Sequence, residues 1–142
     1  MLYASAIVAA PCGGTVRADD PLLTSRGQRQ PEPLRVVLSR SLDLPDSAQL
    51  WDQAVAPTLV AHGCAEGATV VAALQQRGVV VQQLARCEPE ALLKDLASRG
   101  CNRVLWECGP SLAAAALQQG CVQELAVVIA PKLMGGSLAR TP

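Results

Sequence analysis

Aromatic residues and net charge are both scarce in this sequence. Of its 142 residues, Tyr3, Trp51 and Trp106 are the only aromatic ones, and 12 basic side chains balance 12 acidic ones. A platform that stacks on bases needs several exposed aromatic rings, and a protein that binds the phosphate backbone usually presents a basic surface. We therefore expect no nucleic acid among its partners.

Metal ligands are equally scarce. His62 is the only histidine, which excludes a histidine-rich metal cage, and none of the six cysteines forms the C-x-x-C spacing of a zinc ribbon. Most of the cysteines lie in or beside apolar stretches, where a cysteine behaves as a small core hydrophobe. We expect no metal, and we expect thiols in a reducing compartment in preference to a disulfide framework.

No apolar run approaches the roughly 20 residues that a membrane span needs. The apolar N-terminus, residues 1–12, has some likeness to a secretory signal, but it lacks a basic region and its apolar run is short. We interpret it as a core strand. The expected protein is soluble and cytoplasmic, without membrane contact.

Apolar runs alternate with helical patterns over most of the chain. The expected strands are 4–10, 34–38, 58–61, 79–81, 103–106 and 125–130, and the expected helices are 68–77, 88–99 and 110–119. This alternation is typical of an α/β fold with a largely parallel sheet. The strands at 79–81, 103–106 and 125–130 are apolar throughout, so we expect them to be covered on both faces.

The stretch Val104–Leu112 is the first candidate site. A buried strand there passes through Gly109 and Pro110 into a helix of small residues. The first amides of a helix have no partner inside it, so an anion binds well there, and Glu107 would stand beside that anion. Open α/β sheets bind ligands at the carboxyl ends of their strands. An ordinary strand–helix turn explains the pattern about equally well.

The stretch Gly13–Pro21 is the second candidate, with glycines, a hydroxyl, an arginine and two acids. It suits a polar ligand, although a surface turn in which Asp19 and Asp20 bind backbone amides explains it slightly better. Arg26 is equally consistent with a solvated loop. Neither candidate combines a nucleophile with a base, so hydride transfer from a bound cofactor suits these residues better than hydrolysis.

Four stretches, in order, resemble one family. Gly14–Arg26 resembles the G-T-V-x-A-D-D-P-x-L-T-x-R signature of the pyrimidine reductase of riboflavin biosynthesis, the C-terminal domain of the bifunctional deaminase/reductase. Pro33–Leu38 is similar to its P-L-R-V-V-L strand, Glu107–Ala113 to its E-G-G-P-T-L-A turn, and Ala130–Gly136 to its A-P-K-L-L-G-G turn. The resemblance covers residues 14–142.

The resemblance implies a dihydrofolate-reductase-like α/β fold, with a mixed, mostly parallel sheet flanked by helices. It implies reduction of the ribosyl group of 5-amino-6-(5-phosphoribosylamino)uracil to ribityl by NADPH, with hydride passing to C1 of the sugar and the proton coming from Glu107 or a water. Leu23, Arg26 and Glu107 would contact this phosphorylated pyrimidine, with Arg26 at its phosphate. The implied cofactor contacts are Thr15, Asp19, Arg40, Gly109, Pro110, Ser111, Leu112, Ala113, Ala114 and Ala115, with Arg40 near the adenosine end.

The sequence also departs from the family pattern. Cys108 replaces the glycine that usually follows the glutamate, and residues 1–13 fit the pattern poorly. The family's opening strand, its closing strands and its deaminase domain have no counterpart. We therefore interpret residues 1–142 as a single, partial reductase domain, and we expect a homodimer because family domains associate through their sheets.

Two alternative functions stay open. One is a non-catalytic α/β module that binds a nucleotide or a partner subunit, which the missing opening strand favours. The other is a reductase of the same fold that acts on a different pyrimidine or on a pterin through Leu23, Arg26 and Glu107.

Overall fold

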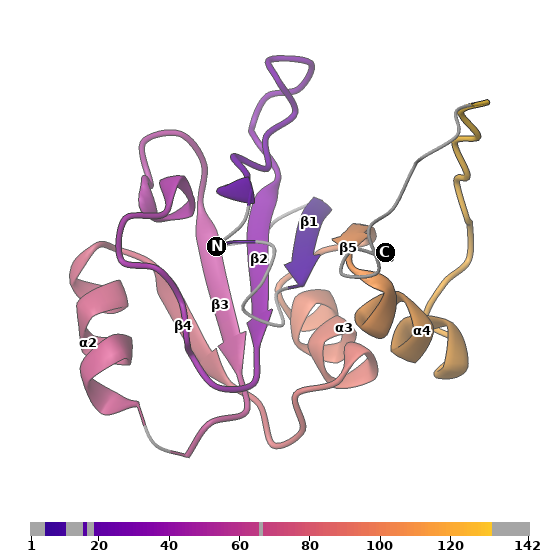
Figure 1. Cartoon of the computed structure of the whole chain (residues 1–142). Helices are drawn as coiled ribbons and strands as arrows, with labels where there is room; N and C mark the ends of the chain where they lie inside the picture. Colours follow the sequence, from indigo (N-terminus) through magenta and orange to yellow (C-terminus); the bar gives the residue numbers. More distant parts are fainter. Residues whose placement is uncertain (1–4, 11–15, 17–18, 66, 132–142) are drawn as a thin grey trace.

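The structure is a computed structural model of the chain, and it describes all residues except 1–4, 11–15, 17–18, 66 and 132–142 (Figure 1). The described elements are β1 (Ser5–Ala10), β2 (Leu34–Ser39), the 3-10 turn η1 (Gln49–Trp51), β3 (Thr58–His62), α2 (Ala68–Gln76), β4 (Val80–Gln83), α3 (Pro89–Ser98), β5 (Arg103–Cys108) and α4 (Pro110–Gln118). The three expected helices and the first five expected strands are confirmed, with ends within two residues of the prediction.

Local sequence explains where helix α3 begins and ends. Pro89 occupies its first turn, where the missing amide costs nothing, and Glu90 places a negative charge near the positive end of the helix dipole. Gly100 follows the helix with φ 85°, a left-handed conformation that glycine adopts without strain. The apolar positions Leu92 and Leu96 lie one turn apart and are fully buried.

The five strands form one sheet in the order β4-β3-β2-β1-β5, and all the described pairings are parallel. Strand β1 lies between β2 and β5, with Val8 opposite both Val36 and Trp106. The α/β class is therefore confirmed. Because the strands point the same way, their carboxyl ends meet at one edge of the sheet.

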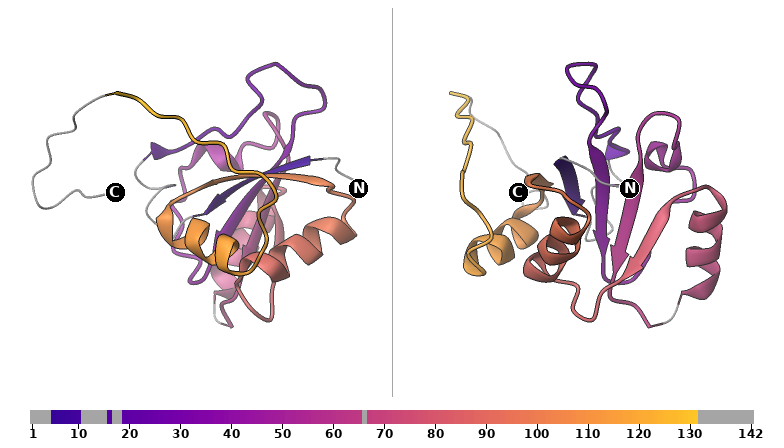
Figure 2. Two further views of the ribbon diagram at one scale, coloured as in Figure 1. Left: turned by 90° about the vertical axis from the view of Figure 1, so that its right-hand side faces the viewer. Right: turned by 180° about the vertical axis from the view of Figure 1, so that it is seen from behind.

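Helices cover both faces of the sheet (Figure 2). Helix α2 lies on one face, and α3 and α4 lie on the other, as the two apolar clusters of the core also require. The α2-face core contains Ile7, Val16, Leu23, Val37, Leu42, Ala48, Leu50, Trp51, Val60, Leu74 and Val79. The α3-face core contains Ala6, Leu34, Val36, Leu38, Leu59, Ala61, Leu84, Leu92, Leu96 and Cys101.

The predicted strand over 125–130 is wrong. Residues 122–131 form no described strand, and Leu125, Val127, Val128 and Ile129 are 70%, 68%, 94% and 86% exposed. The expectation that 79–81 and 103–106 are covered on both faces is also wrong, because β4 and β5 are the two end strands of the described sheet. Val80 is 42% exposed and Leu105 is 53% exposed. An apolar run predicts a strand, but it does not predict the strand's position in the sheet.

Arg35 is a buried charged residue near the amino end of β2. Its side chain is fully buried, although it lies on β2 among apolar neighbours. The guanidinium donates to four carbonyl oxygens, those of Leu22 and Gln49 at 3.4 and 3.5 Å and those of Asp52 and Ala56 at 2.6 and 2.5 Å. It therefore fastens two loops, the one before β2 and the one that contains η1, to the amino end of the sheet.

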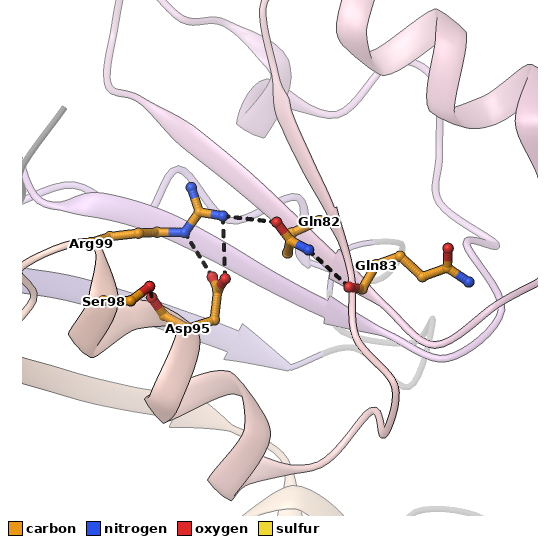
Figure 3. Close-up of polar contacts among 5 residues, drawn as sticks. All are labelled: Gln82, Gln83, Asp95, Ser98 and Arg99. Atoms are coloured by element: carbon orange, nitrogen blue, oxygen red, sulfur yellow. Dashed lines mark hydrogen bonds and ion pairs between the residues drawn. The ribbon is translucent and has the colours of Figure 1, made fainter.

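Arg99, directly after α3, ties this helix to the end strand β4 (Figure 3). Its guanidinium donates to both carboxylate oxygens of Asp95, at 2.7 and 3.3 Å, and to the side-chain oxygen of Gln82 at 3.1 Å. The Gln82 amide donates in turn to the carbonyl oxygen of Gln83 at 2.8 Å. The side chains of Arg99 and Asp95 are 24% and 17% exposed, so water screens this pair less than a surface ion pair.

Replacing Arg35 by methionine should destabilise the chain. The Arg35→Met change keeps most of the apolar stem but removes the donors from four carbonyl oxygens, so we expect the free energy of unfolding to fall by about 3 kcal/mol. Urea unfolding measures this change. The same substitution at Arg29, whose side chain is exposed, is the control and should change it by less than about 0.5 kcal/mol. Equal stability of Arg35→Met and the unchanged chain would contradict the role given to Arg35.

Candidate functional site

Helix α4 begins at the carboxyl end of β5. Gly109 joins them, and the first helical hydrogen bond runs from the Ala113 amide to the Gly109 carbonyl oxygen at 3.1 Å. Pro110 occupies the first helical position and has no amide hydrogen to leave unsatisfied. No described residue accepts a hydrogen bond from the amides of Ser111 or Leu112. Amides in this position, together with the positive end of the helix dipole, favour an anion.

The turn at Gly109 leaves room for a ligand. A Cβ atom built on Gly109 would meet no atom within 4 Å. Its φ of −70° is accessible to any residue, so neither strain nor crowding requires glycine there. Ser111 and Ala114 are exposed, and Ala113 and Ala115 are half-buried. The first two turns of α4 therefore present small side chains beside open space.

Glu107 and Cys108 belong to β5 itself, since the strand ends at Cys108, two residues later than predicted. Glu107 lies opposite Ala9 of β1 and is exposed. Its neighbour Trp106 packs against the α3-face core, so Glu107 points to the opposite face of the sheet. Burial raises the pKa of the Cys108 thiol, which keeps it protonated near neutral pH and makes it a poor nucleophile.

Arg40 lies at the same edge of the sheet as the start of α4. It directly follows Ser39, the last residue of β2, and its side chain is exposed. Only β1 separates β2 from β5 in the sheet. The parallel topology therefore brings an exposed cation and a helix amino terminus, which are far apart in sequence, to one edge.

Leu23 and Arg26 lie in the loop between β1 and β2. Both have positive φ values, 49° and 52°, so the backbone is in the left-handed region at these two residues. Leu23 packs into the α2-face core, on the same side of the sheet as Glu107, whereas Arg26 is exposed. The loop projects beyond the amino end of β2 (Figure 1). The structure therefore sets Arg26 and Arg40 at opposite ends of β2.

Asp20 fixes the start of this loop to η1. Its carboxylate accepts hydrogen bonds from the backbone amide of Gln49 at 2.9 Å and from the Gln49 side chain at 3.1 Å. The Gln49 side chain also donates to the Asp20 carbonyl oxygen at 3.1 Å. This confirms for Asp20 the structural interpretation in which it binds backbone donors. Asp19 is exposed, and Thr15 lies outside the described residues.

Glu32 fixes the other end of the loop. Its carboxylate accepts hydrogen bonds from the amide and the hydroxyl of Ser25, at 2.7 and 2.9 Å. The bond from the Ser25 amide is the main reason that the pKa of Glu32 is lowered, and the Arg35 charge adds a smaller contribution. Arg26 follows Ser25 directly, so it lies in the part of the loop whose two ends are joined by the Ser25–Glu32 hydrogen bonds.

Three groups that position the loop could not be found from the sequence: Asp20–Gln49, Glu32–Ser25 and Arg35. Each joins residues whose proximity no spacing rule predicts. His62, the only histidine of the sequence, also has a place that no sequence pattern predicts. His62 ends β3 at the carboxyl edge, opposite Ser39, and is 5% exposed. Its buried Nδ1 has no hydrogen-bond partner among the described residues.

The described residues form neither a metal-binding cluster nor a membrane-spanning helix. In this part of the chain, histidine, cysteine and acidic side chains do not gather in threes where they could hold a metal ion. None of the described helices combines the length and the apolar character that crossing a membrane requires.

Comparison with known proteins gives one consistent family. Residues 3–142 match the model of the RibD C-terminal domain. The chain is 48% identical to the riboflavin biosynthesis protein RibD of Synechocystis sp. over 130 residues, which are 92% of this chain and 35% of that protein. It is 38% identical to the 2,5-diamino-6-ribosylamino-4(3H)-pyrimidinone 5′-phosphate reductase of Methanothermobacter thermautotrophicus, covering 89% of this chain and 60% of that one.

A solved structure supports the same relationship. A diaminohydroxyphosphoribosylaminopyrimidine deaminase/5-amino-6-(5-phosphoribosylamino)uracil reductase from Thermotoga maritima superposes with a TM-score of 0.61 and 26% identity over 82% of this chain. This confirms the predicted dihydrofolate-reductase-like fold. The chain spans about a third of the length of this protein and of the Synechocystis relative, 31% and 35%.

The loop that carries Arg26 should loosen in acid. Because the folded-state pKa of Glu32 lies below its ordinary value of 4.5, its contribution to stability is present above that value and is lost as the pH falls through the folded-state pKa. We expect Glu32→Gln to destabilise the chain at pH 7, and we expect this difference to shrink below about pH 4.5. Denaturant unfolding at several pH values measures it. Glu124→Gln, at an exposed glutamate, is the control; an equal effect of the two substitutions would contradict the role of Glu32.

Proposed function

Since the chain belongs to the RibD C-terminal domain family, the reductase domains of riboflavin biosynthesis, we propose that it reduces the ribosyl group of 5-amino-6-(5-phosphoribosylamino)uracil to ribityl with NADPH. The observation that supports this proposal most directly is that Arg40, Glu107 and the start of α4 all lie at one edge of the sheet. Anionic and polar parts of a dinucleotide can be bound there without any nucleophile or metal.

The residues at this edge fit a dinucleotide. The amides of Ser111 and Leu112 would hold its diphosphate, and the open space at Gly109 and the small side chains of Ala113, Ala114 and Ala115 let it approach the helix. The exposed Arg40 suits the 2′-phosphate that distinguishes NADPH from NADH. Thr15 and Asp19 would complete the cofactor contacts. NADPH, when bound, supplies the hydride.

The substrate would occupy the sheet face that Glu107 and Leu23 share. Glu107 is exposed there and can accept hydrogen bonds from a pyrimidine or from ribose hydroxyls. The Arg26 guanidinium, which no described residue engages, suits the substrate phosphate. Arg26 and Arg40 lie at opposite ends of β2, which suits two phosphate-bearing groups that must not compete for one cation.

The protein's part in such a reaction is mainly positioning. Asp20, Glu32 and Arg35 hold the loop of Leu23 and Arg26, so the substrate contacts are fixed before binding. Cys108 stays protonated and offers no base. The proton that accompanies the hydride would come from Glu107 or from a water. A cytoplasmic location remains a prediction.

A second candidate substrate follows from one relative. The archaeal protein that is 38% identical to this chain is named a reductase of 2,5-diamino-6-ribosylamino-4(3H)-pyrimidinone 5′-phosphate. Both compounds carry a pyrimidine, a ribose and a phosphate, so the same contacts through Leu23, Arg26 and Glu107 would serve. The two compounds differ in the groups on the pyrimidine ring.

The proposal is tested by following NADPH oxidation with each of the two substrates. We expect turnover with the phosphoribosylaminouracil and slower turnover with the diaminopyrimidinone. Faster turnover with the second would replace the proposed substrate and keep the reductase. If the folded chain binds NADPH saturably but reduces neither substrate, the chain is a non-catalytic nucleotide-binding module and not a reductase. No NADPH binding would contradict the site itself.

The Ser111→Glu substitution should weaken NADPH binding without destabilising the folded chain. A negative charge in the first turn favours the helix through its dipole, so Ser111→Glu should not lower the free energy of unfolding. The same charge repels a diphosphate, and we expect the NADPH dissociation constant to rise about tenfold or more. Isothermal titration calorimetry measures this change. Ser98→Glu, at the other end of a different helix, is the control; equal NADPH affinity of Ser111→Glu and the unchanged chain would exclude α4 as the diphosphate site.

A further inference from the structure

His62 is a buried polar residue whose hydrogen bonding the fold leaves incomplete. It ends β3 at the carboxyl edge and is 5% exposed, and its Nδ1 is enclosed without a partner among the described residues. No hydrogen bond joins Nε2 to a described residue either, yet Nε2 is not among the enclosed atoms, so it faces the open side of the edge. A buried polar atom without a partner is costly and uncommon, so it requires an explanation.

The environment of the ring decides which nitrogen carries the proton. In proteins a buried N–H without an acceptor is rarer than a buried acceptor without a donor. A proton on Nδ1 would create such an N–H, whereas a proton on Nε2 points out of the edge. The fold therefore presents one N–H donor, held by a buried ring, at the carboxyl end of β3.

The end of the neighbouring strand places a cation beside this donor. Ser39, the last residue of β2, lies opposite His62 in the parallel ladder, and Arg40 follows Ser39 directly. The Arg40 side chain is exposed, and no described residue forms an ion pair with it. Because neighbouring strands lie about 4.8 Å apart, the His62 donor and the Arg40 guanidinium can reach one ligand group.

The start of α2 lies at the same corner of the edge. The Leu42 amide donates to the Ser39 Oγ at 3.1 Å, which fixes the turn after β2. A Cβ atom on Gly67, the residue before α2, would lie 2.9 Å from the Leu42 side chain, so this turn and the start of α2 are in contact. No side chain caps α2, and its first turn contains no acidic residue. Its first amides therefore add positive potential at this corner.

We propose that His62 donates from Nε2 to the 2′-phosphate of NADPH, beside Arg40, and that this contact makes the chain prefer NADPH to NADH. A phosphate monoester has several acceptor oxygens, so it can accept from the forked guanidinium and from the imidazole at once. The 2′-hydroxyl of NADH has one oxygen and no charge, so it engages these donors less well. This role of His62 belongs to the cofactor binding proposed above and rests on it.

The order of the strands agrees with this role. From β5 the described sheet continues through β1 to β2 and β3, so Arg40 and His62 lie on the same side of the start of α4, one strand after the other. A dinucleotide whose diphosphate lies at α4 would extend its adenosine end along the carboxyl edge toward β3. His62 is then the farther of the two phosphate contacts.

Substitutions at His62 test the contact in the whole chain. His62→Leu removes the donor but keeps a side chain that packs, so the NADPH dissociation constant should rise about tenfold, while the NADH constant should change by less than about twofold. His62→Gln keeps an N–H donor at the end of the side chain and should retain part of the preference. Gln76→Leu, at an exposed residue at the other end of α2, should change neither constant. Isothermal titration calorimetry measures these constants.

Two further measurements separate binding from packing. His62→Leu removes a buried nitrogen without a partner, so urea unfolding should show a chain at least as stable as the unchanged one. His62 is the only histidine, so nitrogen NMR spectra contain the signals of a single imidazole. We expect the proton on Nε2 in the free chain. These signals should move when adenosine 2′-phosphate is added and stay in place with adenosine.

Three results would overturn the role of His62. Equal loss of affinity for both cofactors, together with lower stability, would make His62 a packing residue. Unchanged NADPH affinity of His62→Leu would leave the 2′-phosphate to Arg40. Equal affinity of the unchanged chain for NADPH and NADH would remove the preference that His62 is proposed to create. The proposed reaction fails separately, since a chain that binds NADPH with this preference but reduces neither substrate keeps the role of His62.

Discussion

The burial of Arg35 is the constraint on which this architecture depends. A guanidinium without water must find acceptors, and here they are four carbonyl oxygens on two separate loops. Burial lowers the pKa of Arg35, while the carboxylates of Asp52 and Glu32 act in the opposite direction. The side chain therefore links β2, η1 and the loop of Leu23 and Arg26 into one unit.

The parallel sheet supplies the second half of the site. Because all the described strands point the same way, Arg40, Glu107 and the amino terminus of α4 reach one edge although they are far apart in sequence. The loop and the carboxyl edge of the sheet present different groups. The loop, held by Asp20, Glu32 and Arg35, presents the exposed Arg26 beyond the amino end of β2, while the carboxyl edge presents the exposed Arg40 and the first amides of α4. The family relationship connects both the loop and the carboxyl edge to the reductase domains of riboflavin biosynthesis.

The part of the chain that follows β5 is the least completely packed. More than half of the surface is exposed in Leu117, Leu125 and Val128, and also in Leu105 on β5 itself. Such exposure costs free energy unless another surface covers it.

The sequence alone determined the α/β class, the helices and the first five strands. The spacing of apolar residues, and the glycines and prolines that stand at the ends of helices and strands, are local signals that a single sequence shows. It also determined the start of α4 and the family, through motifs read in order. Only the tertiary structure decided that β4 and β5 end the described sheet, that 125–130 joins no described strand, and that Arg26 and Arg40 lie at opposite ends of β2. It alone revealed Asp20–Gln49, Glu32–Ser25 and the carbonyl contacts of Arg35. Strand order and long-range hydrogen bonds depend on which segments meet in space, and no local pattern in a single chain encodes that meeting.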